Sequence, residues 1–124
     1  MYVTILRSKI HRATLTETKL HYAGSVTLDR DLIDAAGLLP FESVHVFNIN
    51  TGDRLQTYVI EGEQASGAVC LNGAAARLGQ PGDLIIIVAY AQIEKEEAAS
   101  FAPTVVHVDG QNRIVRVDND PASP

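Results

Sequence analysis

The sequence predicts a mainly β fold in a single domain, and three observations indicate it. Short segments rich in β-branched residues alternate with Gly- and Pro-containing turns along most of the chain. The helical patterns between them are only one to three turns long. The length of 124 residues, with 46% hydrophobic and 20% charged residues, suits one globular domain. Many short strands with few helices favour a closed β-barrel or a compact sheet over a doubly wound fold.

Seven segments have the composition or the alternation of strands: residues 2–13, 44–49, 54–60, 67–71, 84–92, 104–109 and 113–118. Turn residues at 50–53 join the second and third of these into a hairpin. The run 84–92 is apolar enough for a strand that is buried on both faces. Residues 17–19 are expected to form a polar turn.

Three segments predict short helices. Residues 30–36 follow Asp29, which can cap the helix N-terminus, and precede Gly37, which can end it. Residues 74–78 are expected to form one or two helical turns, and residues 94–100 a short polar helix.

Composition and charge exclude several classes of function. The formal net charge of −5 argues against sequence-independent binding of nucleic acid, which needs a basic surface. The single cysteine, Cys70, lies in an apolar run and is interpreted as a small buried hydrophobic residue. The four histidines show no metal-ligand spacing, so no metal site is predicted. The N-terminus lacks a signal-peptide pattern and the longest apolar run is too short for a bilayer, so a cytoplasmic location without membrane contact is expected.

The link between Gly24 and Ser25 is the first candidate for chemistry. Residues 20–28 are expected to form two extended pieces broken at this point. A serine hydroxyl can attack the preceding carbonyl when the backbone is held bent, and a preceding glycine lowers the steric barrier to that bend. The resulting ester can undergo β-elimination, and the dehydroalanine left behind hydrolyses to a pyruvoyl group and ammonia. A simple strand break is the alternative interpretation.

Two further segments carry candidate binding residues. Period-two alternation places Arg54, Gln56 and Tyr58 on one face of a strand. An arginine near a tyrosine can bind a carboxylate and deliver a proton, and an exposed hairpin face is the alternative. In residues 71–78, small side chains at a strand-to-helix junction let backbone N–H groups approach an anion, and a tightly packed turn is the alternative.

Taken in order, these segments resemble the aspartate 1-decarboxylase family, pyruvoyl-dependent enzymes that make β-alanine for pantothenate and coenzyme A biosynthesis. The motifs that carry the resemblance are residues 6–13, 22–25, 50–54, 57–58, 71–77 and 81–83. Each motif alone is weakly specific, whereas the ordered set is strongly specific. Phe47 departs from members that have tryptophan there, and it keeps an aromatic side chain.

The resemblance implies a six-stranded double-psi β-barrel with short helices, and a homotetramer with active sites at subunit interfaces. It covers residues 1–117 as one domain, which would cleave itself into residues 1–24 and 25–124. The polar tail at 118–124 is expected to be disordered. The implied substrate is L-aspartate, and the implied cofactor is a covalent pyruvoyl group derived from Ser25. Whether a maturation partner is needed stays open.

The resemblance also implies roles for individual residues. Ser25 becomes the group that forms a Schiff base, and Tyr58 donates the proton in the decarboxylation. Thr57 assists the cleavage between Gly24 and Ser25. The implied substrate-binding set is Lys9, Arg54, Thr57, Asn72, Gly73, Ala74 and Ala75, and the implied supporting pair is His11 and Tyr22.

Two other functions are compatible with the sequence. One is a non-catalytic double-psi barrel that binds a partner, which would have no need of Gly24–Ser25 together with Tyr58. The other is a pyruvoyl decarboxylase for another amino acid. Lys9 and Arg54 favour a dicarboxylate substrate, but a difference of one methylene group gives only about 10- to 200-fold discrimination.

Overall fold

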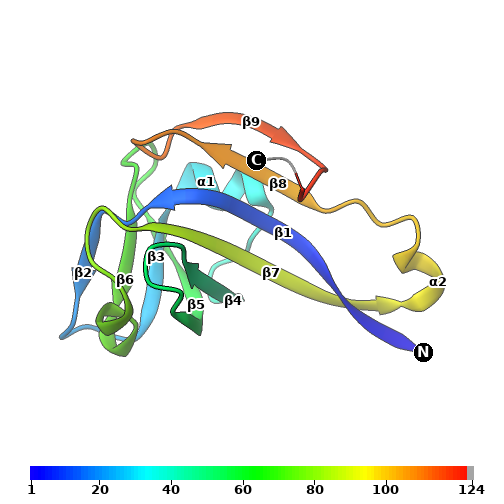
Figure 1. The fold of residues 1–124 in the computed structure, drawn as a ribbon, viewed down its shortest axis with the longest axis horizontal. Coiled ribbons are helices and arrows are strands. Elements are labelled where there is room, and N and C mark those ends of the chain that lie inside the picture. The colour runs from blue at the N-terminus through cyan, green and yellow to red at the C-terminus, as the bar shows by residue number, and fades with distance from the viewer. Residues whose placement is uncertain (123–124) are drawn as a thin grey trace.

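The computed structural model describes residues 1–122, and over these residues the chain is mainly β (Figure 1). The strands are β1 (Tyr2–Thr14), β2 (Glu17–Lys19), β3 (Ser25–Asp29), β4 (Ser43–Asn48), β5 (Arg54–Gly62), β6 (Val69–Asn72), β7 (Leu84–Glu94), β8 (Thr104–Val108) and β9 (Ile114–Asp118). The helices are α1 (Arg30–Ala36), the 3-10 helix η1 (Gly73–Leu78) and α2 (Lys95–Ala98). All seven predicted strands and all three predicted helices are present, with boundaries shifted by a few residues.

The local signals for α1 act as expected. The Asp29 carboxylate accepts a hydrogen bond from the backbone N–H of Asp31 at 2.8 Å, which caps the helix N-terminus. Gly37 ends the helix in the left-handed conformation, at a φ of 68°. Leu32, Ile33 and Ala36 form the buried face.

Three local predictions are wrong. Residues 17–19 form strand β2 instead of a turn, because they pair in parallel with β6, which their own composition does not reveal. Residues 20–24 form a turn and a bend, so only the second of the two extended pieces exists. Strand β7 is not buried on both faces throughout, since Ile86 is partly exposed and Tyr90 is 42% exposed.

The strands follow the order β2-β6-β3-β5-β4-β7-β1-β8-β9 and mix parallel with antiparallel pairs. Strands β1 and β7 form a long antiparallel ribbon, and β8 and β9 continue the sheet beyond β1 (Figure 1). The order has two ends, β2 and β9, and it does not close through hydrogen bonds. The six-stranded double-psi barrel therefore stays a prediction.

A single hydrophobic core is formed by strands from both halves of this sheet order together with helix α1. Its largest fully buried side chains are Ile10, Leu15, Val26, Leu28, Leu32, Ile33, Val44, Val46, Val59, Leu71, Ile85 and Ile87. These come from β1, β3, β4, β5, β6, β7, α1 and the segment before β2, so the two halves of the order pack on one core. This packing fixes the start of β3, where the candidate site lies.

The end of the chain follows β9. Asn119 donates a hydrogen bond to the Pro103 carbonyl at 3.0 Å, and Asp118 and Asp120 accept local backbone bonds. Part of the predicted disordered tail, residues 123–124, lies outside the described residues, and the disorder stays a prediction. Over residues 1–122, no helix is long and apolar enough to cross a membrane.

Candidate functional site

The Gly24–Ser25 link lies at the first residue of β3, between two other strands. Ser25 pairs with Asn72 of antiparallel β6, and Val26 pairs with Val59 of parallel β5. Ser25 is fully buried, whereas Gly24 is exposed. The peptide bond between them therefore crosses from the surface into the core, with strands on both sides of its C-terminal end.

The Ser25 hydroxyl has two hydrogen-bond partners. It donates to the carbonyl oxygen of Ala23 at 2.9 Å and accepts from the Asn72 side-chain amide at 2.9 Å. The bond to Ala23 directs the hydroxyl back along the chain, toward the Ala23–Gly24 peptide, which is next to the Gly24–Ser25 link. A serine oxygen has two lone pairs, so one is left when the Asn72 bond is made.

Gly73 lies directly against this link. A Cβ at Gly73 would lie 2.7 Å from both Cα and N of Gly24, and 2.8 Å from the carbonyl oxygen of Tyr22. Gly73 also has a φ of +65°, which L side chains rarely adopt. Only glycine allows this close approach, so the turn after β6 holds the backbone of residues 22–24 in place.

A pocket of about 370 Å³ opens beside Gly24. Five of the predicted site residues line it: Gly24, Thr57, Tyr58, Ala74 and Ala75. The lining also includes Leu55, Gln56 and Leu78, which the sequence analysis did not assign. This volume lies within the range of small-molecule sites.

Strand β5 alternates as the sequence predicts. Arg54, Gln56 and Tyr58 are exposed, while Thr57 is half-buried. Tyr58 keeps 36% exposure, and its ring lies 6.5 Å from that of Phe41. A tyrosine hydroxyl at the mouth of a pocket can donate a proton to a bound molecule.

The structure does not bring all predicted residues to this pocket. The Arg54 guanidinium stacks over the Phe47 ring at 4.3 Å and does not line it. Lys9 lies on β1, two strands beyond β4 in the sheet order, and donates to the carbonyl of Pro121 at 3.4 Å. Tyr22 is 55% exposed, with the Lys19 ammonium 5.8 Å from its ring centroid.

His11 belongs to a separate cluster where β1 meets β8. Its ring packs edge-on against His107, with centroids 5.7 Å apart. Burial lowers the pKa of His11, and the nearby positive charges, Lys9 first, lower this pKa further. The Nε2 atom of His107 lies 3.1 Å from a carboxylate oxygen of Asp118, whose pKa is lowered mainly by the backbone N–H of Asp120.

Two residues that the sequence analysis did not assign to the site contact the Asn72 amide. Its Nδ2 donates to the Thr27 hydroxyl at 2.9 Å, as well as to Ser25, and its Oδ1 lies 3.1 Å from the Cys70 sulfur. The two-residue period of a strand could have identified both residues from the sequence. Thr27 is two residues after Ser25 and Cys70 is two residues before Asn72, so each pair shares a strand face. Cys70 is buried, as its apolar surroundings predict.

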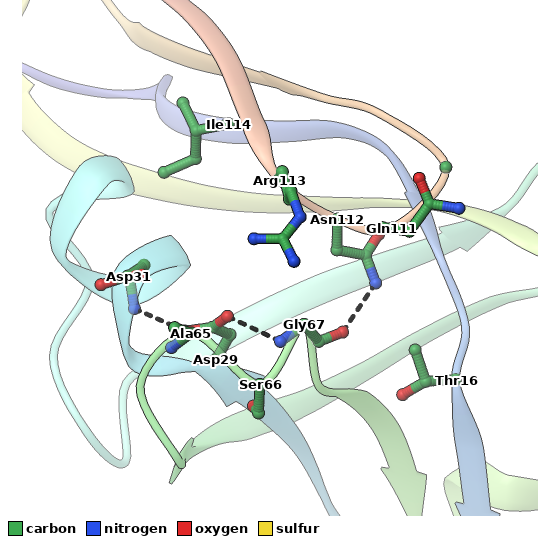
Figure 2. A pocket seen from close by; sticks show the side chains of 11 residues that line it. Thr16, Asp29, Asp31, Ala65, Ser66, Gly67, Gln111, Asn112, Arg113 and Ile114 are labelled. Atoms are coloured by element: carbon green, nitrogen blue, oxygen red, sulfur yellow. Dashed lines mark hydrogen bonds between the residues drawn. The ribbon is translucent and has the colours of Figure 1, made fainter.

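A pocket of about 670 Å³ lies on another part of the surface, between the loop before β6 and the β8–β9 turn (Figure 2). Its buried polar groups are already bonded to the framework. Asp29 accepts from the backbone N–H groups of Ala65 and Gly67, and Asn112 donates to the carbonyl of Gly67 (Figure 2). This pocket is therefore a junction at which buried polar side chains join loops.

A metal ion requires a set of ligand side chains that lie close together. Across residues 1–122, no three His, Cys, Asp or Glu side chains come close enough together to hold an ion.

Comparison with known proteins identifies the family. A family model described as aspartate decarboxylase matches residues 1–115. The chain belongs to the aspartate decarboxylase family. Aspartate 1-decarboxylase of Pelotomaculum thermopropionicum is 57% identical over 117 residues, covering 94% of this chain and 89% of the relative.

Two further relatives support the assignment. Aspartate 1-decarboxylase of Acetivibrio thermocellus is 52% identical over 120 residues, which cover 97% of this chain and 95% of the relative. The protein of that name from Ruminiclostridium cellulolyticum is 56% identical over 119 residues, covering 96% and 93%. The match to the aspartate decarboxylase family includes every strand and helix that contributes to the Gly24–Ser25 site.

Proposed function

We propose that this protein is a self-processing aspartate 1-decarboxylase that converts L-aspartate to β-alanine and CO2 for pantothenate and coenzyme A biosynthesis. One observation carries the proposal: the Ser25 hydroxyl is buried, accepts from Asn72 and donates back along the chain to the Ala23 carbonyl, beside a pocket that Gly24 and Tyr58 line. A barrel that only binds a partner has no use for this arrangement.

The first step is the cleavage of the precursor into residues 1–24 and 25–124. The Ser25 oxygen forms a bond to the carbonyl carbon of Gly24, the bond from that carbon to the Ser25 nitrogen breaks, and the hydroxyl proton ends on this nitrogen. Elimination across Ser25 then releases the Gly24 carboxylate, and hydrolysis of the dehydroalanine releases ammonia and leaves a pyruvoyl group. Thr57 is proposed to assist because it lines the same pocket as Gly24.

The residues at Ser25 fit such a group. Ser25 Cα would become its ketone carbon, beneath a pocket whose lining next to Gly24 comes from small alanines and the β5 side chains. Once formed from Ser25, the pyruvoyl group would supply two functions: a ketone that condenses with an amine, and a neighbouring amide carbonyl that accepts electrons. The chain's own residues then have to bind two carboxylates, exclude water and deliver one proton.

Tyr58 is proposed to deliver that proton to the carbon that loses CO2. Its hydroxyl belongs to a side chain at the pocket mouth, and a positioned acid contributes about 10²- to 10⁴-fold to a rate. The backbone of Gly73, Ala74 and Ala75 is proposed to contact the substrate, and Asn72 to orient it from below.

The positive charges for the substrate are proposed to come together in a homotetramer. Arg54 lies on the same strand as Tyr58, and its guanidinium makes no ion pair with any side chain in residues 1–122. Lys9 lies on β1, three strands along the sheet order from β5, so a neighbouring subunit is proposed to supply this positive charge at each pocket, with His11 of the same strand in a supporting role. Exposed aromatic side chains at Phe41 and Tyr90 provide apolar surface for such an interface.

The remaining features of the proposal concern the whole chain. The parallel pairs β1–β8, β2–β6 and β3–β5, interleaved with antiparallel pairs around one core, support a double-psi barrel in the assembled protein. We propose a single domain over residues 1–117 and a cytoplasmic location. Tyr22 is proposed to support the site from the turn that precedes Gly24.

Intact mass spectrometry together with an activity assay tests the proposal. The purified protein is expected to give two chains, residues 1–24 and 25–124. The longer chain should have the mass expected for an N-terminal pyruvoyl group instead of a serine, and it should react with hydroxylamine. It is expected to release β-alanine from L-aspartate and to act more slowly on L-glutamate. The Ser25→Ala variant is the matched control, and it should remain a single chain without activity. A wild-type protein that stays whole, or a Ser25→Ala variant that makes β-alanine, would contradict the proposal.

A further inference from the structure

The side-chain amide of Asn72 is held between three groups. It is 1% exposed, and it contacts the Ser25 and Thr27 hydroxyls through Nδ2 and the Cys70 sulfur through Oδ1. Thr27 and Cys70 lie opposite each other in the β3–β6 pair. They are two positions along from the opposed residues Ser25 and Asn72. The amide is therefore fixed from the side that faces away from Gly24.

Only one orientation of this amide satisfies its neighbours. The Ser25 hydroxyl already donates its proton to the Ala23 carbonyl, so its oxygen must accept from Asn72. An amide turned by 180° would place a carbonyl oxygen against that oxygen. The same turn would place N–H groups against the Cys70 thiol and leave them with a poor acceptor.

Cys70 acts as a donor in this arrangement. Burial raises the pKa of its thiol, with Glu17 adding to the effect, so the sulfur keeps its proton at neutral pH. The thiol proton directs Oδ1 toward Cys70, and the Thr27 oxygen accepts the second N–H of the amide. Together these two contacts leave one N–H of Asn72 aimed at Ser25.

We propose that Thr27 and Cys70 are positioning residues for the self-cleavage, which act by fixing the Asn72 amide so that it holds the Ser25 oxygen against the Gly24 peptide. This inference rests on the proposed function and names two residues that set the rate of its first step. With Asn72 and Ala23 each bonded to Ser25, one lone pair of the oxygen remains to attack the Gly24 carbonyl carbon. Loss of either contact leaves a buried amide atom without a partner and lets the amide turn.

The cleavage rate of newly made precursor tests this inference. Precursor is made by cell-free synthesis, and the appearance of the 25–124 chain is followed by gel and mass spectrometry. Thr27→Val keeps the branched shape and removes the acceptor, and Cys70→Ala removes the donor; each is expected to slow cleavage about five- to tenfold. Thr27→Ser keeps the acceptor hydroxyl, and Cys70→Ser supplies a hydroxyl donor in place of the thiol, so both variants are expected to cleave within about twofold of wild type.

Thr16→Val is the matched control. The Thr16 hydroxyl bonds the backbone of Val69 at 2.9 and 3.0 Å, so it also anchors β6, but it does not touch Asn72. It is expected to lower the melting temperature without a matching loss of cleavage rate. Slow cleavage in Thr16→Val, or slow serine variants, would show a merely structural role and overturn the inference.

Two outcomes separate this inference from the function on which it rests. If wild type cleaves and makes β-alanine while Thr27→Val and Cys70→Ala cleave at the wild-type rate, the inference is wrong and the proposed function stands. If wild type does not cleave at all, both are wrong.

Discussion

Replacement of Gly73 by alanine tests whether the turn after β6 holds the cleavage link. An added Cβ would meet Cα and N of Gly24 at 2.7 Å and the carbonyl oxygen of Tyr22 at 2.8 Å. All three contacts are backbone atoms, which cannot swing away as a side chain does. The left-handed φ of +65° adds a second cost.

The magnitude follows from these two terms. A left-handed conformation costs an alanine about 1–2 kcal/mol. Overpacking against an unyielding neighbour typically costs a further 1–3 kcal/mol or so. Gly73→Ala is therefore expected to lose about 2–5 kcal/mol of unfolding free energy, with the Gly24 backbone displaced from the Ser25 hydroxyl.

Gly52→Ala is the control that separates the two terms. Gly52 has a φ of +80°, and an added Cβ would meet nothing within 4 Å. This variant is expected to lose only the conformational term, about 1–2 kcal/mol, and to cleave normally. Urea unfolding at a fixed protein concentration, with Ser25→Ala in every chain to keep it whole, measures both losses.

Cleavage of the two glycine variants is measured separately, with Ser25 present. Gly73→Ala is expected to leave most of the precursor whole under conditions in which Gly52→Ala is fully processed. Equal stabilities and equal cleavage in the two variants would refute the reasoning, because the close approach at Gly73 would then have no consequence.

Three further variants test the remaining residues. Tyr58→Phe should be processed normally but lose about 10²- to 10⁴-fold in kcat, and normal turnover would remove Tyr58 as the proton donor. Arg54→Ala should raise KM for L-aspartate about 10- to 100-fold, with Arg54→Lys intermediate, and an unchanged KM would count against substrate contact. Because the pKa of His11 is lowered in the fold, the unfolded chain binds the extra proton first and stability falls as pH drops below about 6.5. The melting temperature of His11→Asn should therefore fall less than that of wild type when the pH is lowered from about 7.5 to about 5.5. An equal fall would contradict this reasoning. His21→Asn, at an exposed histidine, is the control.

Local signals in the sequence were sufficient for much of the fold. The cap at Asp29, the stop at Gly37 and the hairpin turn at 50–53 depend on a few adjacent residues, and they are found where expected. Strand β2 is different, because Glu17–Lys19 becomes extended only through its pairing with Cys70–Asn72. Sheet order depends in the same way on contacts between distant residues, which periodicity does not encode.

The candidate site shows the same difference between local signals and contacts of distant residues. Gly24, Thr57, Tyr58, Ala74 and Ala75 were predicted as site residues and line one pocket. Their motifs come from three separate segments, and the sequence alone gave no reason beyond the resemblance for these segments to meet. The charged residues did not join them in the single chain, since Lys9 and Arg54 lie outside that lining.

The Asn72–Gly73 dipeptide links the proposed cleavage to the folded state. Asn72 bonds the Ser25 hydroxyl from 47 residues away, and Gly73 packs on the Gly24 backbone. Neither contact exists until β6 pairs with β3, so an unfolded chain holds Ser25 in an ordinary, unreactive peptide. The arrangement around Ser25 is therefore formed by long-range packing, and the residues that contact its hydroxyl and the preceding backbone also close this part of the core.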